Sequence, residues 1–168
     1  MALPSPWKSI FNKDSFNTVM KNIYSPETLS EITSRMNKLT SSSTRQWGKM
    51  NVAQMLAHCS AALEAATGQK CPPRTTIGKI LGPLFKGTYL GEKPLGKNSP
   101  TDKSFIISDD RNFNFEHERL RKLITLFSTG GEDNCTKHPH SFFGHLTPAE
   151  WGIAQYKHLD HHLRQFGA

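Results

Sequence analysis

Cysteine and long apolar stretches are both scarce in this chain. Only three of the 168 residues are cysteine, and no two of them form a Cys-x-x-Cys pair. An odd number of widely separated cysteines argues against a disulfide framework and indicates a reducing compartment. No apolar run is long enough to span a bilayer, and residues 1–8 lack the continuous apolar segment of a signal peptide. We therefore expect a cytoplasmic protein without a membrane partner.

Runs of basic residues are absent too, although the chain is basic overall. Lys and Arg total 21 against 14 Asp and Glu, a formal net charge of +7 with histidines neutral. No run of five or more basic residues and no zinc-finger spacing occurs, which argues against nucleic-acid binding. The positive excess suits an anionic small molecule or solubility alone. We expect a small-molecule substrate and no nucleic-acid partner.

The motifs of several common enzyme classes are missing as well. The chain has no Ser-His-Asp order, no phosphate-binding loop and no dinucleotide glycine motif. With 36% apolar residues, a chain of this length can bury a core of its own. We predict a single domain over residues 1–168, in which residues 1–24 form an N-terminal extension packed on the rest.

Four segments show the apolar periodicity of amphipathic helices. A capping residue followed by proline marks two starts, at Ser25-Pro26 and at Thr147-Pro148, and the second of these begins a capping box with Glu150. Serine or glycine clusters mark ends. The expected helices cover about residues 25–40, 51–67, 114–130 and 147–166, and residues 15–23 suit a further short helix.

A segment rich in proline and glycine, residues 68–111, joins the second and third expected helices. A connection of this length lets the flanking helices run parallel, as in helix bundles with a crossover. Apolar residues from Ile77 to Phe85 predict one short helix that covers an end of the bundle, and residues 105–107 suggest a short strand. The sequence thus predicts an all-α fold, a four-helix bundle with a long crossover between helices 2 and 3.

Three histidines on two expected helices are candidate metal ligands: two lie on the inner side of the fourth helix, and His58 lies at the margin of the apolar face of the second, where it could line a pocket or be half exposed. His158 and His162 stand four residues apart, so their side chains are stacked neighbours on one helix, and His58 belongs to another. Three neutral imidazoles with one open position form the ligand set of a catalytic zinc-type site. A core histidine is often only hydrogen-bonded, so the spacing alone leaves a metal site and a structural role equally open.

A helical wheel ranks the histidines of the fourth helix. The solvent face of this helix is defined by four charged residues, Glu150, Lys157, Asp160 and Arg164. His158 and His162 flank Trp151 on the opposite side, which keeps both as candidate metal ligands. His161 falls at the edge toward solvent, so we expect it to be a surface residue or a hydrogen-bond partner of a ligand.

The other polar candidates receive lesser roles. Gln54 and Gln155, each one helical turn from a candidate ligand, could hydrogen-bond substrate or water. Cys59 points into the core as a small apolar filler, and His117 faces inward in a structural role. No general base is identified, because Glu64 points toward solvent. Three loop histidines could close over one end of a site: His138, His140 and His145.

Three stretches of the chain resemble a known family. They run from Trp47 to Cys59, from His138 to Thr147 and from Tyr156 to Gly167. A histidine on helix 2 with His-x-x-x-His on helix 4 resembles the DinB/YfiT-like metalloenzyme superfamily. The stretches are similar to an uncharacterised bacterial branch of it, catalogued as a domain of unknown function, and the resemblance covers about residues 25–167.

This resemblance implies an up-down-down-up bundle with a divalent metal, zinc or nickel, on His58, His158 and His162. Characterised relatives are transferases or isomerases that use low-molecular-weight thiols such as bacillithiol, mycothiol or glutathione, and many members are homodimers. The resemblance therefore implies a metal-dependent enzyme, and first of all a thiol-dependent S-transferase. A metal-dependent hydrolase and a non-catalytic metal-binding or stress-response module stay open.

Overall fold

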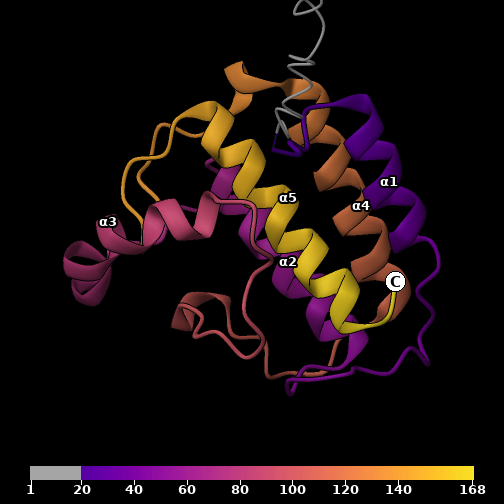
Figure 1. The fold of residues 1–168 in the computed structure, drawn as a ribbon. Helices are drawn as coiled ribbons and strands as arrows, with labels where there is room; N and C mark the ends of the chain where they lie inside the picture. Colours follow the sequence, from indigo (N-terminus) through magenta and orange to yellow (C-terminus); the bar gives the residue numbers. More distant parts are fainter. Residues whose placement is uncertain (1–19) are drawn as a thin grey trace, which may run out of the picture.

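The fold is all-helical, as predicted. The computed structural model describes residues 20–168, and within them it contains five α-helices, two 3₁₀ helices and no β-strand. The α-helices are α1 (Pro26–Met36), α2 (Val52–Ala66), α3 (Thr76–Leu90), α4 (Phe113–Gly130) and α5 (Pro148–Gln165) (Figure 1). The 3₁₀ helices are η1 (Lys103–Phe105) and η2 (Glu132–Asn134).

Capping contacts confirm the predicted starts of three helices. The side chains of Ser25, Asn51 and Thr147 each accept a hydrogen bond from a backbone N–H in the first turn of α1, α2 and α5. In α2 and α5, Gln54 and Glu150 bond back to the N–H of the capping residue, which completes a capping box. These contacts lie within four residues of the chain, so the sequence alone can predict them.

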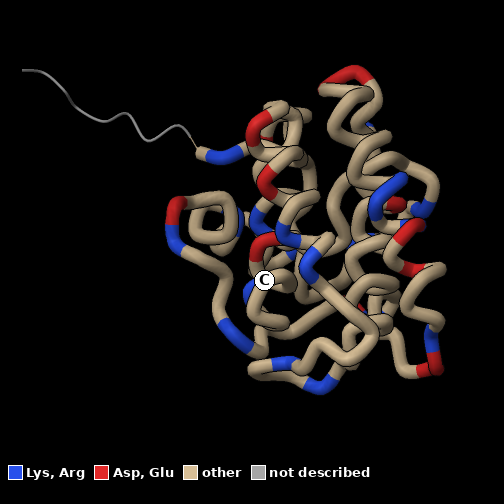
Figure 2. The backbone as a smooth tube through the Cα atoms, turned by 90° about the vertical axis from the view of Figure 1, so that its right-hand side faces the viewer, with Lys and Arg blue, Asp and Glu red and all other residues tan. Residues whose placement is uncertain are grey.

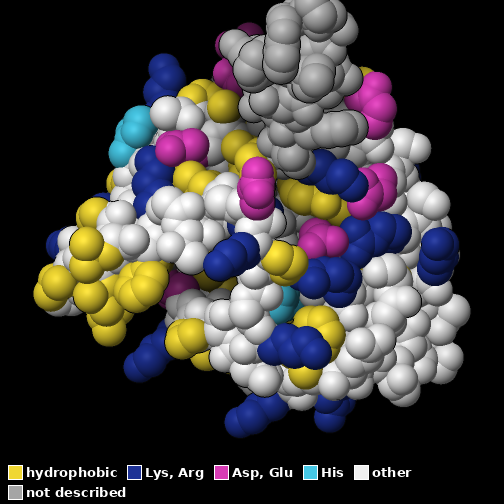
Figure 3. Space-filling view, viewed as in Figure 1, with side chains coloured by type: hydrophobic (Ala, Val, Ile, Leu, Met, Phe, Trp, Pro, Cys, Tyr) yellow, Lys and Arg dark blue, Asp and Glu magenta, His cyan; other side chains and the backbone are white. Residues whose placement is uncertain are grey.

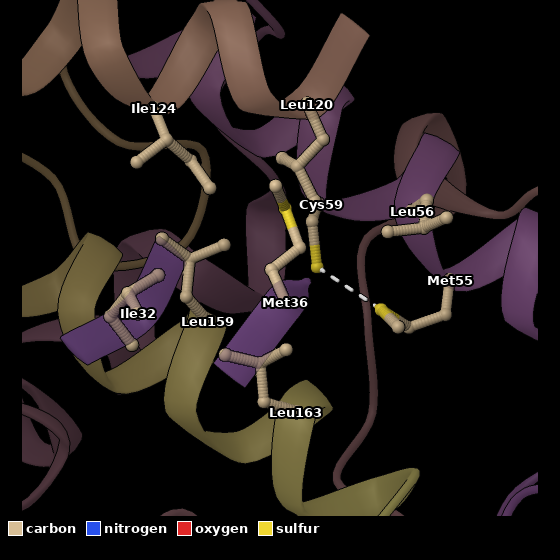
Figure 4. A pocket seen from close by; sticks show the side chains of 9 residues that line it. All are labelled: Ile32, Met36, Met55, Leu56, Cys59, Leu120, Ile124, Leu159 and Leu163. Carbon is tan, nitrogen blue, oxygen red and sulfur yellow. Dashed lines mark hydrogen bonds between the residues drawn. The ribbon is translucent and has the colours of Figure 1, made fainter. Parts of the chain in front are cut away.

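Four of the helices, α1, α2, α4 and α5, share one apolar core. α2 packs against α4 and α5, and α1 packs against the same two helices. Figure 4 shows nine apolar side chains from these four helices around a cavity of about 10 Å³, no larger than one water molecule needs. Cys59 lies there, with its Sγ atom 3.8 Å from Sδ of Met55, and burial raises the pKa of its thiol. The prediction that Cys59 fills the core is confirmed.

The connection between α2 and α4 differs from the prediction. It holds α3, a helix of 15 residues that packs beside α5, in place of the expected short helix. Thr75 caps α3, and Gly78 and Gly82 let one face of the helix lie directly on the backbone of Phe142. The helix predicted between Ile77 and Phe85 therefore exists but is longer than predicted, because this distant contact supports a helix that continues through Pro83.

Two other local predictions are wrong. Residues 105–107 form no strand, since η1 ends at Phe105 and the described residues offer no strand to pair with. Residues 20–23 are not helical, because Ile23 instead donates its N–H to the carbonyl of Gly152 and accepts from the hydroxyl of Ser128. The remainder of the predicted N-terminal extension, residues 1–19, lies outside the described residues.

Charged side chains pair across the surface of the helices. Figure 2, which views the side that α1 faces, shows Lys and Arg interspersed with Asp and Glu. Asp160 of α5 accepts a hydrogen bond of 2.9 Å from Arg35 of α1. Glu64, predicted to face solvent, is instead buried and paired with Lys70 and Arg119. The prediction is wrong because α4 packs against α2 and places Arg119 beside Glu64. A helical wheel of α2 alone does not show this contact.

Candidate metal centre

The structure brings together the three histidines singled out by the sequence, here called the triad. His58 on α2 faces His158 and His162 on α5, and one ring nitrogen from each lies within 4.8 Å of the others. The Nε2 atoms of His58 and His158 are 3.0 Å apart, and the ring centroid of His162 lies 4.7 Å from each of the other two. Because the rings converge from two packed helices, the triad could hold one metal ion.

Hydrogen bonds to oxygen determine which nitrogen carries the hydrogen in two of these rings. Nδ1 of His58 lies 2.8 Å from the carbonyl oxygen of Phe105, and a carbonyl only accepts, so His58 donates from Nδ1. Gln165 donates its amide N–H to the carbonyl of Trp47 at 2.8 Å, which leaves Oε1 to accept from Nδ1 of His162, also at 2.8 Å. Both neutral rings therefore present an Nε2 lone pair, as a metal ligand must.

His158 differs from the other two rings. Its Nδ1 atom is buried and has no hydrogen-bond partner among the described residues. A neutral His158 can carry its hydrogen on Nε2 and donate it to Nε2 of His58, 3.0 Å away, or carry it on Nδ1 and present a third lone pair. Only the second form completes a set of three ligands, so metal binding selects one tautomer of His158.

Burial keeps the triad neutral. Desolvation lowers the pKa of His58, lowers the pKa of His162 to about 3 and lowers that of His158 well below its usual value. Neighbouring imidazoles add to this effect at His158 and His162, because positive charges so close together repel. Neutral imidazole is the form that binds metal, so no proton has to leave the triad near pH 7.

The face of α5 that the helical wheel assigned to solvent is partly covered. Lys157 is only 5% exposed, and its ammonium group donates to the carbonyl oxygens of Gly91 and Lys93. His161 is 8% exposed and packs against Trp47, with 5.6 Å between the ring centroids. Lys157 was predicted on the solvent face and His161 at its edge, and the exposure predicted for both is wrong because the chain after α3 and the loop before α2 fold over this face.

Three glutamines near the triad have distinct roles. Gln54 completes the cap of α2 and donates its amide N–H to the carbonyl of Asp109 at 3.2 Å, so it is not free for a substrate. Gln155 is buried, and its Oε1 has no partner among the described residues, so it stays available. Gln165, which orients His162, was missed. Its spacing of three residues from a candidate ligand on the same helix was the signal that could have found it.

The histidines of the loop before α5 do not join the triad. Nδ1 of His140 accepts from the N–H groups of Phe142 and Phe143 at 3.1 and 3.2 Å, and the ring centroid lies 5.4 Å from that of Trp151. Burial lowers the pKa of His140 to about 4. His140 therefore shapes the turn against the start of α5. His117 lies 3.2 Å from a backbone carbonyl of α1, which confirms its structural role.

Two cavities of the described chain lie away from the triad. One is the small apolar cavity in the core, and the other is an open groove of about 620 Å³ whose lining includes Glu64, Phe115 and Arg119. The triad itself is covered on the His58 side by the end of η1, while His158 is its partly exposed member.

Comparison with known proteins finds a matching family model and no characterised relative. The model is described as "Protein of unknown function (DUF1569)", and it matches residues 20–168. No curated protein and no solved structure matches the chain. The match includes the triad and all five α-helices. Because the description names no activity, the function has to be argued from the geometry.

Proposed function

The chain belongs to the family described as "Protein of unknown function (DUF1569)", and we propose that within it this protein is a metal-dependent enzyme with one divalent cation on the triad. The observation that carries the proposal is the orientation of the rings. Phe105 and Gln165 hold His58 and His162 with their Nε2 lone pairs available. In metal-bound histidine, the ring nitrogen that does not bind the metal usually donates its N–H to an oxygen acceptor. Three protein ligands leave a fourth position open, as in catalytic zinc sites.

The residues around the triad define what each would contribute. A divalent cation bound there supplies Lewis acidity, which lowers the pKa of a thiol or a water molecule in the open position. The Phe105 carbonyl and the Gln165 amide keep two rings in the ligating tautomer. Gln155, one turn from His158, would hydrogen-bond a donor group of the substrate through its free Oε1. The end of η1 limits the access of water from the side of His58.

For the reaction, we favour a thiol-dependent S-transferase that acts on a small electrophilic substrate. The thiolate sulfur would bond to an electrophilic carbon of the substrate, and the group it displaces would leave with the electron pair of the broken bond. The net charge of +7 would attract an anionic thiol. The three stretches that resemble the DinB/YfiT-like superfamily support this assignment. They also support an up-down-down-up bundle of α1, α2, α4 and α5 with α3 in the crossover, zinc or nickel as the metal, and a homodimer in the cytoplasm.

A non-catalytic role is the second candidate. The contact of 3.0 Å between Nε2 of His58 and Nε2 of His158 links α2 to α5 directly, so the triad could serve only to join two helices. Glu64 and Asp160 are held in ion pairs and do not supply a general base. A metal-dependent hydrolase is a further variant, in which water takes the open position.

The metal content of the purified protein tests the proposal. We expect about one equivalent of divalent metal per wild-type chain, and almost none in His158→Ala or His162→Ala, by elemental mass spectrometry at neutral pH. The matched control is His145→Ala, an exposed loop histidine that should leave the metal unchanged. Circular dichroism must show unchanged helix content in all variants. A wild type that binds no divalent metal contradicts the proposal.

Ligand-dependent thermal stability distinguishes the reaction classes. A thiol that binds the folded, metal-loaded protein raises its melting temperature by mass action. Stabilisation by glutathione, bacillithiol or mycothiol that disappears when the metal is removed supports the transferase. Ester hydrolysis without any effect of a thiol supports the hydrolase. If the protein binds metal but shows neither stabilisation by a thiol nor ester hydrolysis, the result supports the non-catalytic role in which the triad only joins α2 to α5.

A further inference from the structure

Helix α3 exposes a row of large apolar side chains. Ile77, Ile80, Leu84 and Phe85 are exposed by 60%, 68%, 74% and 52% of their surface. Figure 3 shows a gathering of apolar side chains at the edge of the molecule, at the place of α3 in Figure 1. Soluble proteins rarely leave large apolar side chains clustered in this way unless the surface has a partner.

The opposite face of α3 is anchored, which fixes the row in its outward position. A Cβ atom at Gly78 would lie 2.6 Å from Cα of Phe142, and one at Gly82 would overlap the carbonyl oxygen of the same residue. Farther along α3, Lys86 forms an ion pair of 2.7 Å with Glu150 of α5. Residues three, four and seven apart share a helix face, so the apolar row cannot turn inward without breaking these contacts.

The segment that contains α3 is rich in basic residues, of which Lys70 and Lys86 pair with Glu64 and Glu150 from outside it. Residues 70–103 contain seven Lys and Arg against two Asp and Glu, a net charge of +5 out of +7 for the whole chain. α3 itself contains two lysines and no acidic residue, and Lys79 is exposed beside the apolar row.

We propose that α3 is an interfacial helix that docks the protein on an anionic membrane surface. Its apolar row would enter the boundary between headgroups and acyl chains, and the exposed Lys79 would face the lipid phosphates. No helix of the described residues is long and apolar enough to cross a membrane, so α3 would lie on the surface and not span it. The proposal replaces the expectation of no membrane partner, which considered spanning segments only, and it does not depend on the metal.

Charge and area favour lipid over a second copy of the chain at this face. Two copies that met through α3 would bring together two segments with an excess of basic residues, which repel. A stable dimer buries about 800 Å² per partner, more than one row of side chains on a single helix provides. A convex ridge also suits a fluid lipid interface, because no pocket has to match its shape.

Co-sedimentation with lipid vesicles tests the docking. The full chain is mixed with vesicles of phosphatidylcholine alone, or with about one third phosphatidylglycerol added. We expect binding to the anionic vesicles only, weakened at least about tenfold by the double substitution Ile80→Glu with Leu84→Glu and also by high salt. The matched control, Leu126→Glu, changes an apolar side chain of α4 that is 51% exposed and should leave binding unchanged.

Two outcomes would overturn the proposal. One is that neither kind of vesicle sediments the wild type. The other is that the wild type does not bind vesicles but forms a dimer in light scattering, and that the double substitution dissociates this dimer. That result would assign the face to a second copy of the chain. All three substituted side chains are exposed, so the variants should fold, and unchanged melting curves confirm that the comparison is valid.

Discussion

At the scale of single residues, the hydrogen bonds of each ring decide what a histidine can do. His58 and His162 donate from Nδ1 to oxygen, so each keeps an Nε2 lone pair for a metal. Nδ1 of His140 instead accepts from two backbone N–H groups, so the hydrogen of this ring is on Nε2. The same residue type thus serves as a candidate ligand in one place and as a turn support in another.

Replacement of Gln165 should weaken metal binding without removing a ligand. In Gln165→Leu, Nδ1 of His162 loses its acceptor, so we expect the affinity for zinc to fall about 10- to 100-fold. Competition with a fluorescent chelator measures this affinity. Gln69→Leu, at an exposed position, is the control and should bind zinc like the wild type. Equal affinity in Gln165→Leu would show that this amide does not orient the ligand.

The buried His140 should make the protein less stable in acid. Burial lowers its pKa from 6.5 to about 4, so below pH 6.5 the unfolded chain takes up a proton that the folded chain does not. The free energy of unfolding therefore falls as the pH drops from about 6.5 to about 4. In His140→Asn, which keeps an acceptor for the Phe142 and Phe143 N–H groups, this fall should be smaller by about 1–2 kcal/mol.

Urea unfolding of metal-free protein at several pH values measures this difference. Both proteins share the triad, so its titration cancels in the comparison. Parallel pH profiles of the wild type and His140→Asn would contradict the assignment of His140.

At the scale of elements, helix starts follow from local chemistry and helix surroundings do not. Ser25, Asn51 and Thr147 cap their helices through contacts a few residues away, and their roles are readable in the sequence. The length of α3 depends on the contact of Gly78 and Gly82 with Phe142, which belongs to the distant loop before α5. For this reason the apolar periodicity of residues 77–85 predicted only a short helix in place of α3.

Two glycines of α3 should respond in opposite ways to the same substitution. In Gly82→Ala the new methyl group overlaps the carbonyl oxygen of Phe142, so we expect a loss of about 1–3 kcal/mol in the free energy of unfolding. In Gly87→Ala the new methyl group meets no atom within 4 Å, so helix propensity should stabilise the protein by about 0.5–1 kcal/mol. Urea unfolding measures both, and equal effects would mean that α3 is not docked on Phe142.

At the scale of the whole molecule, the triad joins helices that are far apart in the chain. His58 and His158 are 100 positions apart in the sequence, and only the packing of α2 against α5 brings their Nε2 atoms to 3.0 Å. A cation on the triad would thus bind the folded state and not the unfolded chain. Folding stability and metal binding should therefore be linked.

Metal removal should lower the stability of the folded protein measurably. At a free zinc concentration about 100 times the dissociation constant, the linkage predicts about 2.7 kcal/mol of added stability, lost on addition of a chelator. Thermal melts with and without chelator measure it. His58→Ala should show no difference between the two conditions, and His145→Ala should behave as the wild type. An unchanged melting temperature of the wild type on addition of the chelator would contradict a metal on the triad.

The sequence by itself determined the all-α class, the starts of three long helices and the shared face of His158 and His162. All of these depend on contacts or periodicity within a few turns of one helix. Only the tertiary structure decided that Lys157, His161 and Glu64 are covered, because their cover comes from other segments of the chain. It also decided which face of α3 is left to solvent. The apolar pattern of a helix depends only on its own residues, whereas the burial of its side chains depends on which distant segments pack against the helix.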